Sequence, residues 1–261
     1  MNHLARSLLV ALFGLILVLS SASAGGRPQS SSSRPDILDG SRQLIVVTTR
    51  DWNTDEARLE RYERKGPGKP WKPVGQPFTV MVGKNGLGWG LGLVPAPADT
   101  GGAPIKKEGD GKAPAGIFRL GTVFGYSSRK YAGSKMPYLP LTATVECPDD
   151  SASAHYNTLV DRSQSTPDWS SSEQMLRSDS LYQWGIFVDH NSGPARPGAG
   201  SCIFLHIWRG PGRPTVGCTA MPAEKMEEML AWLDSGKAPL LVQLPEAEYQ
   251  RLQAAWGLPA R

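Results

Sequence analysis

A histidine and a cysteine stand on either side of a glycine- and proline-rich bend in the stretch "FLHIWRGPGRPTVGCTAMP". His206 ends an apolar run, and Cys218 lies between Gly217 and Thr219. A cysteine attacks a carbonyl as the thiolate, and a neighbouring imidazole can take up the thiol proton. The backbone N–H of Gly217 or Cys218 could stabilise the resulting oxyanion. This spacing is equally consistent with cysteine-based acyl chemistry and with a hydrogen-bonded core histidine beside a packed small cysteine.

The elements around the bend predict how this pair is positioned. The run "GSCIFLHIW" is typical of a strand, on which Cys202, Phe204 and His206 share one face because side chains alternate. The bend "RGPGRPTVG" is long enough to return the chain to the end of that strand. A helix beginning near Pro222 would place the positive end of its dipole close to Cys218 and favour the thiolate.

The rest of the pattern is mostly β. Strands are predicted at "QLIVVTT", "PFTVMVG", "GIFRL", "YQWGIFVDHN" and "PLLVQLP", and the ambiguous "DEARLERYERK" also favours a strand. Helices are predicted only at "PAEKMEEMLAWLDSG", with Gly236 as its C-cap, and at "PEAEYQRLQAAWG". The five glycines of "GKNGLGWGLGL" predict a tight turn, because the lysine and Ser/Thr of a phosphate-binding loop do not follow them.

The N-terminus has the pattern of an export signal. A basic "MNHLAR" precedes the apolar "SLLVALFGLILVLS" and the small residues "SASA". The apolar run is short for a membrane span of about 20 residues, so cleavage is favoured over an uncleaved anchor. We therefore expect a signal peptide at 1–24, a flexible leader at 25–41, one catalytic domain at 42–245 and a helical tail at 246–261. The mature protein is expected in the periplasm or cell envelope, without a membrane span.

Composition limits the partners. The 261 residues include 28 Lys and Arg against 24 Asp and Glu, a net charge of +4. This scattered excess fits an anionic polymer or surface, and no nucleic-acid recognition motif accompanies it. The histidines lack the paired spacing of a metal site, and no cofactor motif is present. We expect neither a metal nor a cofactor.

The bend resembles the signature of the L,D-transpeptidase (YkuD-type) catalytic domain family, in which a histidine precedes Ser/Thr-x-Gly-Cys. His206 matches the histidine, and Thr215 to Cys218 match the second part. The segment "KAPAGIFRLGTVFGY" is similar to the family's "T-P-x-G-x-F-x-L-G" strand, with Ala113 where threonine is common. The resemblance covers about residues 42–245.

The departures from the family pattern lie around the cysteine. Val216 stands where many members carry a second histidine, and Ala220 where many carry Arg or Asn. The gap between His206 and Cys218 is also shorter than usual. These differences indicate a divergent branch whose substrate and acceptor can differ from those of other members.

The resemblance implies a mainly β fold, a β-sandwich of mixed sheets with a few helices. It also implies that Cys218 attacks a peptidoglycan stem peptide while His206, oriented by the Ile207 carbonyl, acts first as base and then as acid. The acyl group would pass to an amine of a second stem peptide or a protein. Two alternatives are a carboxypeptidase or amidase that uses water, and a non-catalytic wall-binding domain. A thiol–disulfide oxidoreductase is disfavoured because C-x-x-C is absent.

Five residues are predicted to bind substrate. Arg209 and Arg213 could pair with stem-peptide carboxylates, although a solvated loop is equally consistent with them. Thr215 belongs to the motif. Trp208 could line the pocket or simply pack, and His190 could contact substrate or make a structural hydrogen bond.

The three cysteines of an exported chain predict one disulfide and one free thiol. Cys147 and Cys202 are the expected partners, which leaves Cys218 reduced. The alternative is that Cys147 and Cys202 are two unpaired buried thiols.

Overall fold

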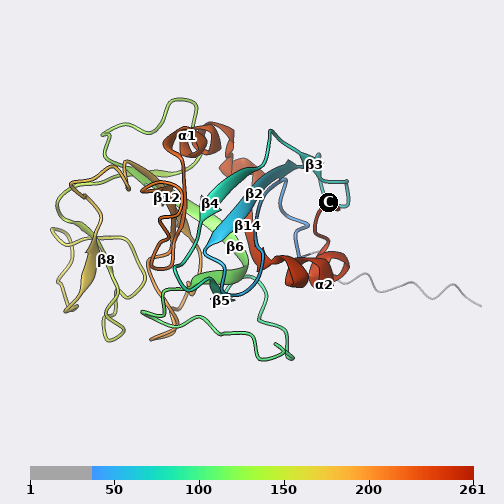
Figure 1. Ribbon diagram of the computed structural model, residues 1–261. Coiled ribbons are helices and arrows are strands. Elements are labelled where there is room, and N and C mark those ends of the chain that lie inside the picture. The colour runs from blue at the N-terminus through green and yellow to red at the C-terminus, as the bar shows by residue number, and fades with distance from the viewer. Residues whose placement is uncertain (1–36) are drawn as a thin grey trace, which may run out of the picture. The chain divides into compact units, whose positions relative to one another are not determined.

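Strands make up most of the regular structure in residues 37–261, the part of the chain that the computed structural model describes (Figure 1). The predicted signal peptide and most of the leader lie outside the described residues. The strands are β1 (Gln43–Thr49), β2 (Glu56–Glu63), β3 (Lys72–Pro73), β4 (Phe78–Met81), β5 (Leu87–Trp89), β6 (Ala113–Gly125), β7 (Tyr138–Pro140), β8 (Val145–Pro148), β9 (Val160–Asp161), β10 (Ser172–Gln174), β11 (Trp184–Val188), β12 (Phe204–Ile207), β13 (Thr219–Met221) and β14 (Leu240–Pro245). The helices are α1 (Ala223–Trp232) and α2 (Glu246–Trp256), with a 3₁₀ turn at Ser235–Lys237.

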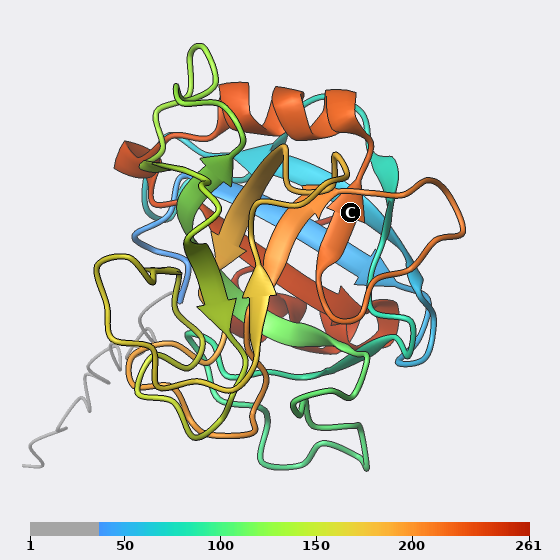
Figure 2. The ribbon, with the colours of Figure 1, turned by 90° about the vertical axis from the view of Figure 1, so that its left-hand side faces the viewer.

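The main sheet closes on itself. Its strands follow the order β1-β14-β6-β11-β12-β13-β4-β2, and β1 pairs with β2 as well as with β14 (Figure 2). The pairs β1–β14 and β12–β13 are parallel, and the other pairs along this path, such as β11–β12, are antiparallel. The mainly β class with mixed strand directions is therefore confirmed, and the β1–β2 pairing makes the large sheet barrel-like.

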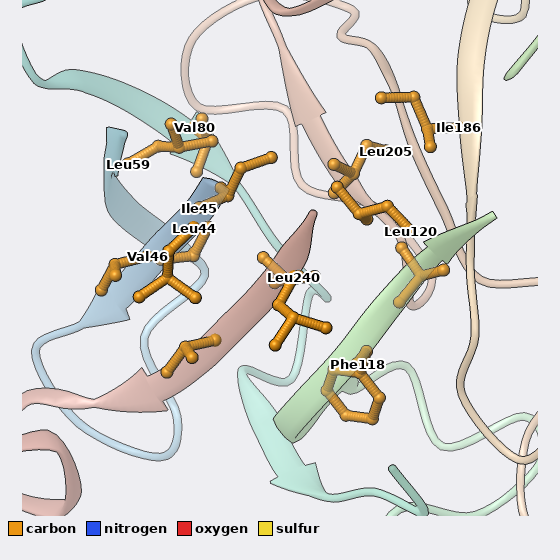
Figure 3. Packing of buried hydrophobic residues seen from close by; sticks show 14 of the residues in the cluster. Leu44, Ile45, Val46, Leu59, Val80, Phe118, Leu120, Ile186, Leu205 and Leu240 are labelled. Carbon is orange, nitrogen blue, oxygen red and sulfur yellow. The ribbon is translucent and has the colours of Figure 1, made fainter. Parts of the chain in front are cut away.

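The core forms because strands such as β1 are buried on both faces. All seven residues of "QLIVVTT" are buried, as its continuous β-branched pattern predicts. The apolar side chains gathered from β1, β2, β4, β6, β11, β12 and β14 share one cluster (Figure 3). Helix α2 adds Tyr249, Leu252 and Trp256 to this cluster, so the predicted C-terminal tail packs into the same core.

The first helix ends earlier than the sequence predicts. Its C-cap is Leu233, whose ψ of 137° is extended, and Gly236 instead lies inside the following 3₁₀ turn. The Leu233 side chain is fully buried, and Asp234 accepts a hydrogen bond from the Gly236 N–H at 2.9 Å. Burial of Leu233 and this new turn together stop α1 before the predicted glycine. Within residues 37–261, neither helix has the length and apolar character needed to cross a membrane.

The strand that carries the histidine is also shorter than predicted. β12 begins at Phe204, so Cys202 lies outside it, with a positive φ of 53°. Cys202 forms a disulfide with Cys147 of β8, as predicted. The prediction that Cys202 continues the regular alternation of Phe204 and His206 is therefore wrong, because the chain turns at Cys202 to meet Cys147.

A small second sheet lies beside the main one. Strands β10, β8 and β9 form it in that order, and we call it the cap. Figures 1 and 2 place β8 on the side of the main sheet where β12 runs. Phe204, Cys202 and Cys218 share a hydrophobic cluster with Cys147 and Val145 of the cap. The disulfide and this cluster attach the cap close to the predicted nucleophile.

The glycine-rich segment is the tight turn that its composition predicts. Gly86 has a φ of +75°, and a Cβ there would lie 2.1 Å from the Trp52 carbonyl oxygen. Neither the left-handed backbone nor the close approach suits an L-residue with a side chain. The glycines of this segment therefore let loops pack tightly together, rather than bind a phosphate.

We expect Gly86→Ala to lower the free energy of unfolding by about 2–4 kcal/mol, because the new methyl group must displace backbone as well as adopt a strained φ. Urea denaturation would measure the loss. Gly133→Ala is the matched control, since Gly133 has a φ of +82° with open space around it. Equal losses in the two variants would show that backbone strain alone, and not the close approach, matters at Gly86.

Candidate active site

The predicted catalytic residues line one cavity of about 420 Å³. His206 reaches it from β12, and Cys218 comes from the segment just before β13. The bend between them contributes Arg209, Arg213 and Thr215. The remaining lining comes mainly from the cap side and from the loop before β6: Lys106, Glu108, Asp149, Glu173, Arg177 and Tyr182. The fold thus brings the bend, the cap and the predicted pair to one site.

Cys218 is a free thiol held against the backbone of β12. Its side chain is buried, and its Sγ accepts a hydrogen bond from the Phe204 N–H at 3.3 Å. The Sγ also lies 3.6 Å from the Cys202 carbonyl oxygen, to which the thiol can donate. Burial, with a smaller contribution from the negative charge of Glu173, raises the pKa of the Cys218 thiol. The thiol is therefore protonated at neutral pH.

His206 is fixed in one orientation. Its Nδ1 lies 2.7 Å from the Ile207 carbonyl oxygen, which accepts the hydrogen bond that the resemblance implies. The proton therefore belongs on Nδ1, and Nε2 keeps its lone pair. The Tyr182 ring packs edge-on against the imidazole, with centroids 5.2 Å apart. Burial lowers the pKa of His206 to about 4, so the imidazole is neutral and able to accept a proton at neutral pH.

His206 and Cys218 are both neutral, so the thiolate that the helix dipole is expected to favour is not the resting form. Within residues 37–261, the hydrogen-bond partners of the Cys218 sulfur are the Phe204 N–H and the Cys202 carbonyl oxygen, and the His206 ring is bonded to Ile207 instead. Along the parallel β12–β13 pair, His206 lies opposite Ala220. The predicted effect of the α1 dipole is about 1 kcal/mol or less, which is below one pKa unit, whereas burial acts on both groups. Burial therefore outweighs the helix dipole.

The motif threonine organises the turn before the nucleophile. Thr215 Oγ1 donates a hydrogen bond to the Cys218 carbonyl oxygen at 2.6 Å and accepts one from the Gly217 N–H at 3.1 Å. The Gly217 N–H, a predicted oxyanion donor, is therefore already engaged. A Cβ at Gly217 would contact the Ile203 side chain and the Lys112 carbonyl oxygen at 3.3 Å. Gly217 therefore allows this turn to pack closely against Ile203 and Lys112.

The other predicted binding residues divide into two groups. Arg209 and Arg213 line the cavity, with both side chains reaching it from the bend. Trp208 is half-buried and is not part of the lining. His190 is also outside the lining and fully buried, and its ring nitrogens bond the backbone of Leu91 at 3.2 Å and Ala199 at 3.1 Å. The substrate-binding prediction for His190 is therefore replaced by a structural hydrogen-bonding role, and the pKa of its buried ring is lowered to about 4.

The sequence reasoning missed the cap side of the cavity. Glu173 and Tyr182 lie on the lining, and the Tyr182 hydroxyl donates a short hydrogen bond to Glu173 Oε1. Glu108 and Lys106 also line the cavity from the loop before β6. No motif or spacing marks these residues, because tertiary packing brings them to the site. Glu173 reaches it through the pairing of β10 with β8, and the others reach it from the segments before β6 and β11.

Comparison with protein families decides the relationship. The model of the YkuD family, the L,D-transpeptidase catalytic domain, matches residues 49–242. The chain belongs to this family. Neither curated proteins nor solved structures gave a match. The L,D-transpeptidase match spans most of the barrel and includes the bend with His206 and Cys218.

The neutral pair of this L,D-transpeptidase domain predicts slow thiol chemistry at neutral pH. We expect the rate of Cys218 alkylation by iodoacetamide to keep rising through pH 9, since the raised pKa keeps the thiolate scarce below that pH. Intact mass measured over a pH series would give the rate. Peptide mapping would confirm that residue 218 carries the label. A rate plateau at or below pH 7 would instead indicate a resting thiolate–imidazolium pair.

Proposed function

We propose that this protein is an exported cysteine L,D-transpeptidase that acts on peptidoglycan stem peptides through an acyl-enzyme on Cys218. One observation carries the proposal: in a chain of this family, His206 and the only free cysteine of the described residues line a single cavity. The family supplies the reaction type, and the cavity supplies a nucleophile and a base. The substrate is therefore an amide of the wall polymer, whose anionic character suits the net charge of +4.

Acylation requires one proton to pass from the Cys218 thiol through His206 to the leaving amine. As the Cys218 sulfur attacks the amide carbon, its proton passes to Nε2 of His206 and a C–S bond forms. The amide C–N bond then breaks, and the imidazolium returns the proton to the leaving D-amino acid. Substrate binding replaces the water of the cavity with the peptide. The Cys218 sulfur must then give up its hydrogen bond with the Phe204 N–H to attack the carbonyl carbon.

The two arginines of the bend suit the charge of the substrate. Arg209 and Arg213 lie on the lining beside the reacting pair. A stem peptide that ends in a D-residue carries a free carboxylate near the bond to be cleaved. A guanidinium pairs with such a carboxylate through two parallel hydrogen bonds. We therefore assign these two arginines to the terminal carboxylate of the donor peptide.

Export is part of the proposal. The N-terminal signal pattern sends the chain to the periplasm or cell envelope, where the wall polymer is found and where disulfides form. The Cys147–Cys202 disulfide of the structure is consistent with that compartment.

Incubation with a stem tetrapeptide, followed by mass spectrometry, tests the proposal. A transpeptidase gives cross-linked dimers with loss of the terminal D-residue from the donor. A hydrolase on the same fold gives only the shortened peptide, and a wall-binding domain gives neither product while still retaining the peptide. An acyl-enzyme adduct on residue 218 is expected in the first two cases. Failure to observe both the adduct and any product would overturn the catalytic proposal.

A further inference from the structure

We infer that Glu173 is the residue that receives the acceptor amine and takes up its proton, which makes this cap carboxylate a catalytic group of the second half-reaction. The inference rests on the proposed function, because it concerns how the acyl-enzyme is resolved. It names a chemical class for the acceptor, a primary amine that arrives as an ammonium ion.

The position of Glu173 is the first argument. It lies on β10 and lines the same cavity as Cys218 and His206. The Tyr182 hydroxyl donates to its Oε1, and the ring of the same tyrosine packs against His206. One tyrosine therefore links the cap carboxylate to the catalytic imidazole and fixes both.

The second argument is that one oxygen of Glu173 remains available. Oε1 accepts from Tyr182, whereas no hydrogen bond within residues 37–261 engages Oε2. The side chain is 27% exposed, so a ligand in the cavity can reach it. A carboxylate with a free oxygen inside a partly desolvated cavity is suited to an ammonium ion.

Charged groups of both signs surround Glu173. Arg177 lies 3.8 Å from Glu173 Oε1 but is bonded to Asp179 through two nitrogens, at 2.9 and 2.8 Å. Asp149 adds a second negative charge on the lining, and the Tyr182 hydroxyl and the Cys218 thiol are further titratable groups near Glu173. The cations Lys84, Lys106, Arg209 and Arg213 also line the cavity, and Lys106 is paired with Asp110 at 2.6 Å. Arg177 is therefore neutralised by Asp179. With Arg209 and Arg213 paired with the carboxylate of the donor peptide, as the proposed function has it, an acceptor ammonium meets the negative charges of Glu173 and Asp149.

Glu108 is a useful contrast. It also lines the cavity, but its Oε2 accepts hydrogen bonds from the hydroxyls of Tyr156 at 2.5 Å and Ser201 at 2.7 Å. Those two hydroxyls already satisfy Oε2 of Glu108, so it is less available to a ligand. Glu173 has only one such bond. Burial also raises the pKa of Glu173, so its carboxylate is a stronger base than an exposed one.

The proton balance of the step follows from these positions. An acceptor ammonium gives one proton to the Glu173 carboxylate, and the freed nitrogen lone pair forms a C–N bond with the thioester carbon. The C–S bond breaks, and the sulfur of Cys218 leaves with the electron pair. The second proton of the nitrogen passes through His206 to that sulfur and restores the thiol. Glu173 then releases its proton to solvent.

The test compares two acceptors on the full chain. The donor is a stem tetrapeptide, the cationic acceptor is the amine of a second tetrapeptide, and the neutral acceptor is hydroxylamine, which is uncharged at neutral pH. For Glu173→Gln we expect the ratio of transfer to hydrolysis to fall at least about tenfold with the cationic acceptor, as loss of one charged contact predicts. With hydroxylamine the same ratio is expected to stay within about twofold of wild type. Formation of the acyl-enzyme, followed by intact mass, checks that the variant folds and acylates.

Controls separate the possible failures. Glu224→Gln removes an exposed carboxylate from the first turn of α1 and should leave both ratios unchanged. Equal transfer by wild type and Glu173→Gln, a larger loss in Asp149→Asn, or a wild-type acyl-enzyme that transfers to no amine would each overturn the inference while the proposed nucleophile stands. A wild-type protein that forms no acyl-enzyme would overturn the proposed function as well.

Discussion

Replacing Cys218 by alanine is expected to lower formation of cross-linked and shortened peptides by about 10³-fold or more, because removal of a nucleophile leaves only binding and polar stabilisation. The variant should also lose the acyl-enzyme adduct and the single iodoacetamide label of the native protein. The other two cysteines form a disulfide and cannot replace the thiol. Mass spectrometry of the tetrapeptide reaction measures the products.

Two further variants show whether a loss of product comes from the missing nucleophile or from misfolding. Cys218→Ser keeps the size of the side chain and a hydrogen bond to the Phe204 N–H, so it should fold like wild type while remaining nearly inactive. His206→Gln should keep the free thiol but slow its acylation. Products from a folded Cys218→Ala protein at more than about 1% of the wild-type rate would rule out Cys218 as the nucleophile.

Removal of the disulfide through the double substitution Cys147→Ala and Cys202→Ala is expected to lower the free energy of unfolding by about 4 kcal/mol. The bridge joins residues that are 55 positions apart. In the chain-entropy model, the closed loop lowers the conformational entropy of the unfolded chain, and without the bridge the unfolded state regains that entropy. For a protein of this size the melting temperature should fall by roughly 10 °C. Differential scanning calorimetry measures both quantities.

Loss of the disulfide should also lower the activity of the site. Cys147 lies opposite Glu173 in the cap, and the Cys202 carbonyl contacts the Cys218 sulfur at 3.6 Å. We therefore expect slower acylation and a lower ratio of transfer to hydrolysis in the double variant. Reductant should lower the melting temperature of wild type but not of the double variant. A loss of less than about 1 kcal/mol would show that the cap is held by its packing alone.

Several elements follow directly from local sequence. "QLIVVTT" is β1 with the predicted bounds, and "PEAEYQRLQAAWG" contains α2. Their periodicity is a short-range property, because it depends on which face each residue presents. The turn chemistry between His206 and Cys218 is equally local, and so is the free thiol left by an odd number of cysteines. The candidate nucleophile and base could therefore be proposed before any fold was known.

Errors arose where distant residues compete with local preference. The predicted helix cap at Gly236 was wrong because Leu233 is drawn into the core. The binding role predicted for His190 was not found, since its ring is bonded to backbone from two other segments. In both cases a contact formed on folding outweighs what the neighbouring residues favour.

The sequence by itself determined the family signature and the mainly β pattern, and it predicted the candidate reactive pair and the disulfide partners. Only the tertiary structure decided that the main sheet closes through β1 and β2, that the resting pair is neutral, and that Glu173 of the cap shares the cavity with Cys218. The physical reason is the distance along the chain over which each effect acts. Periodicity and turn residues act over a few positions, whereas burial, which sets the charge of the pair, depends on residues brought together from the whole chain.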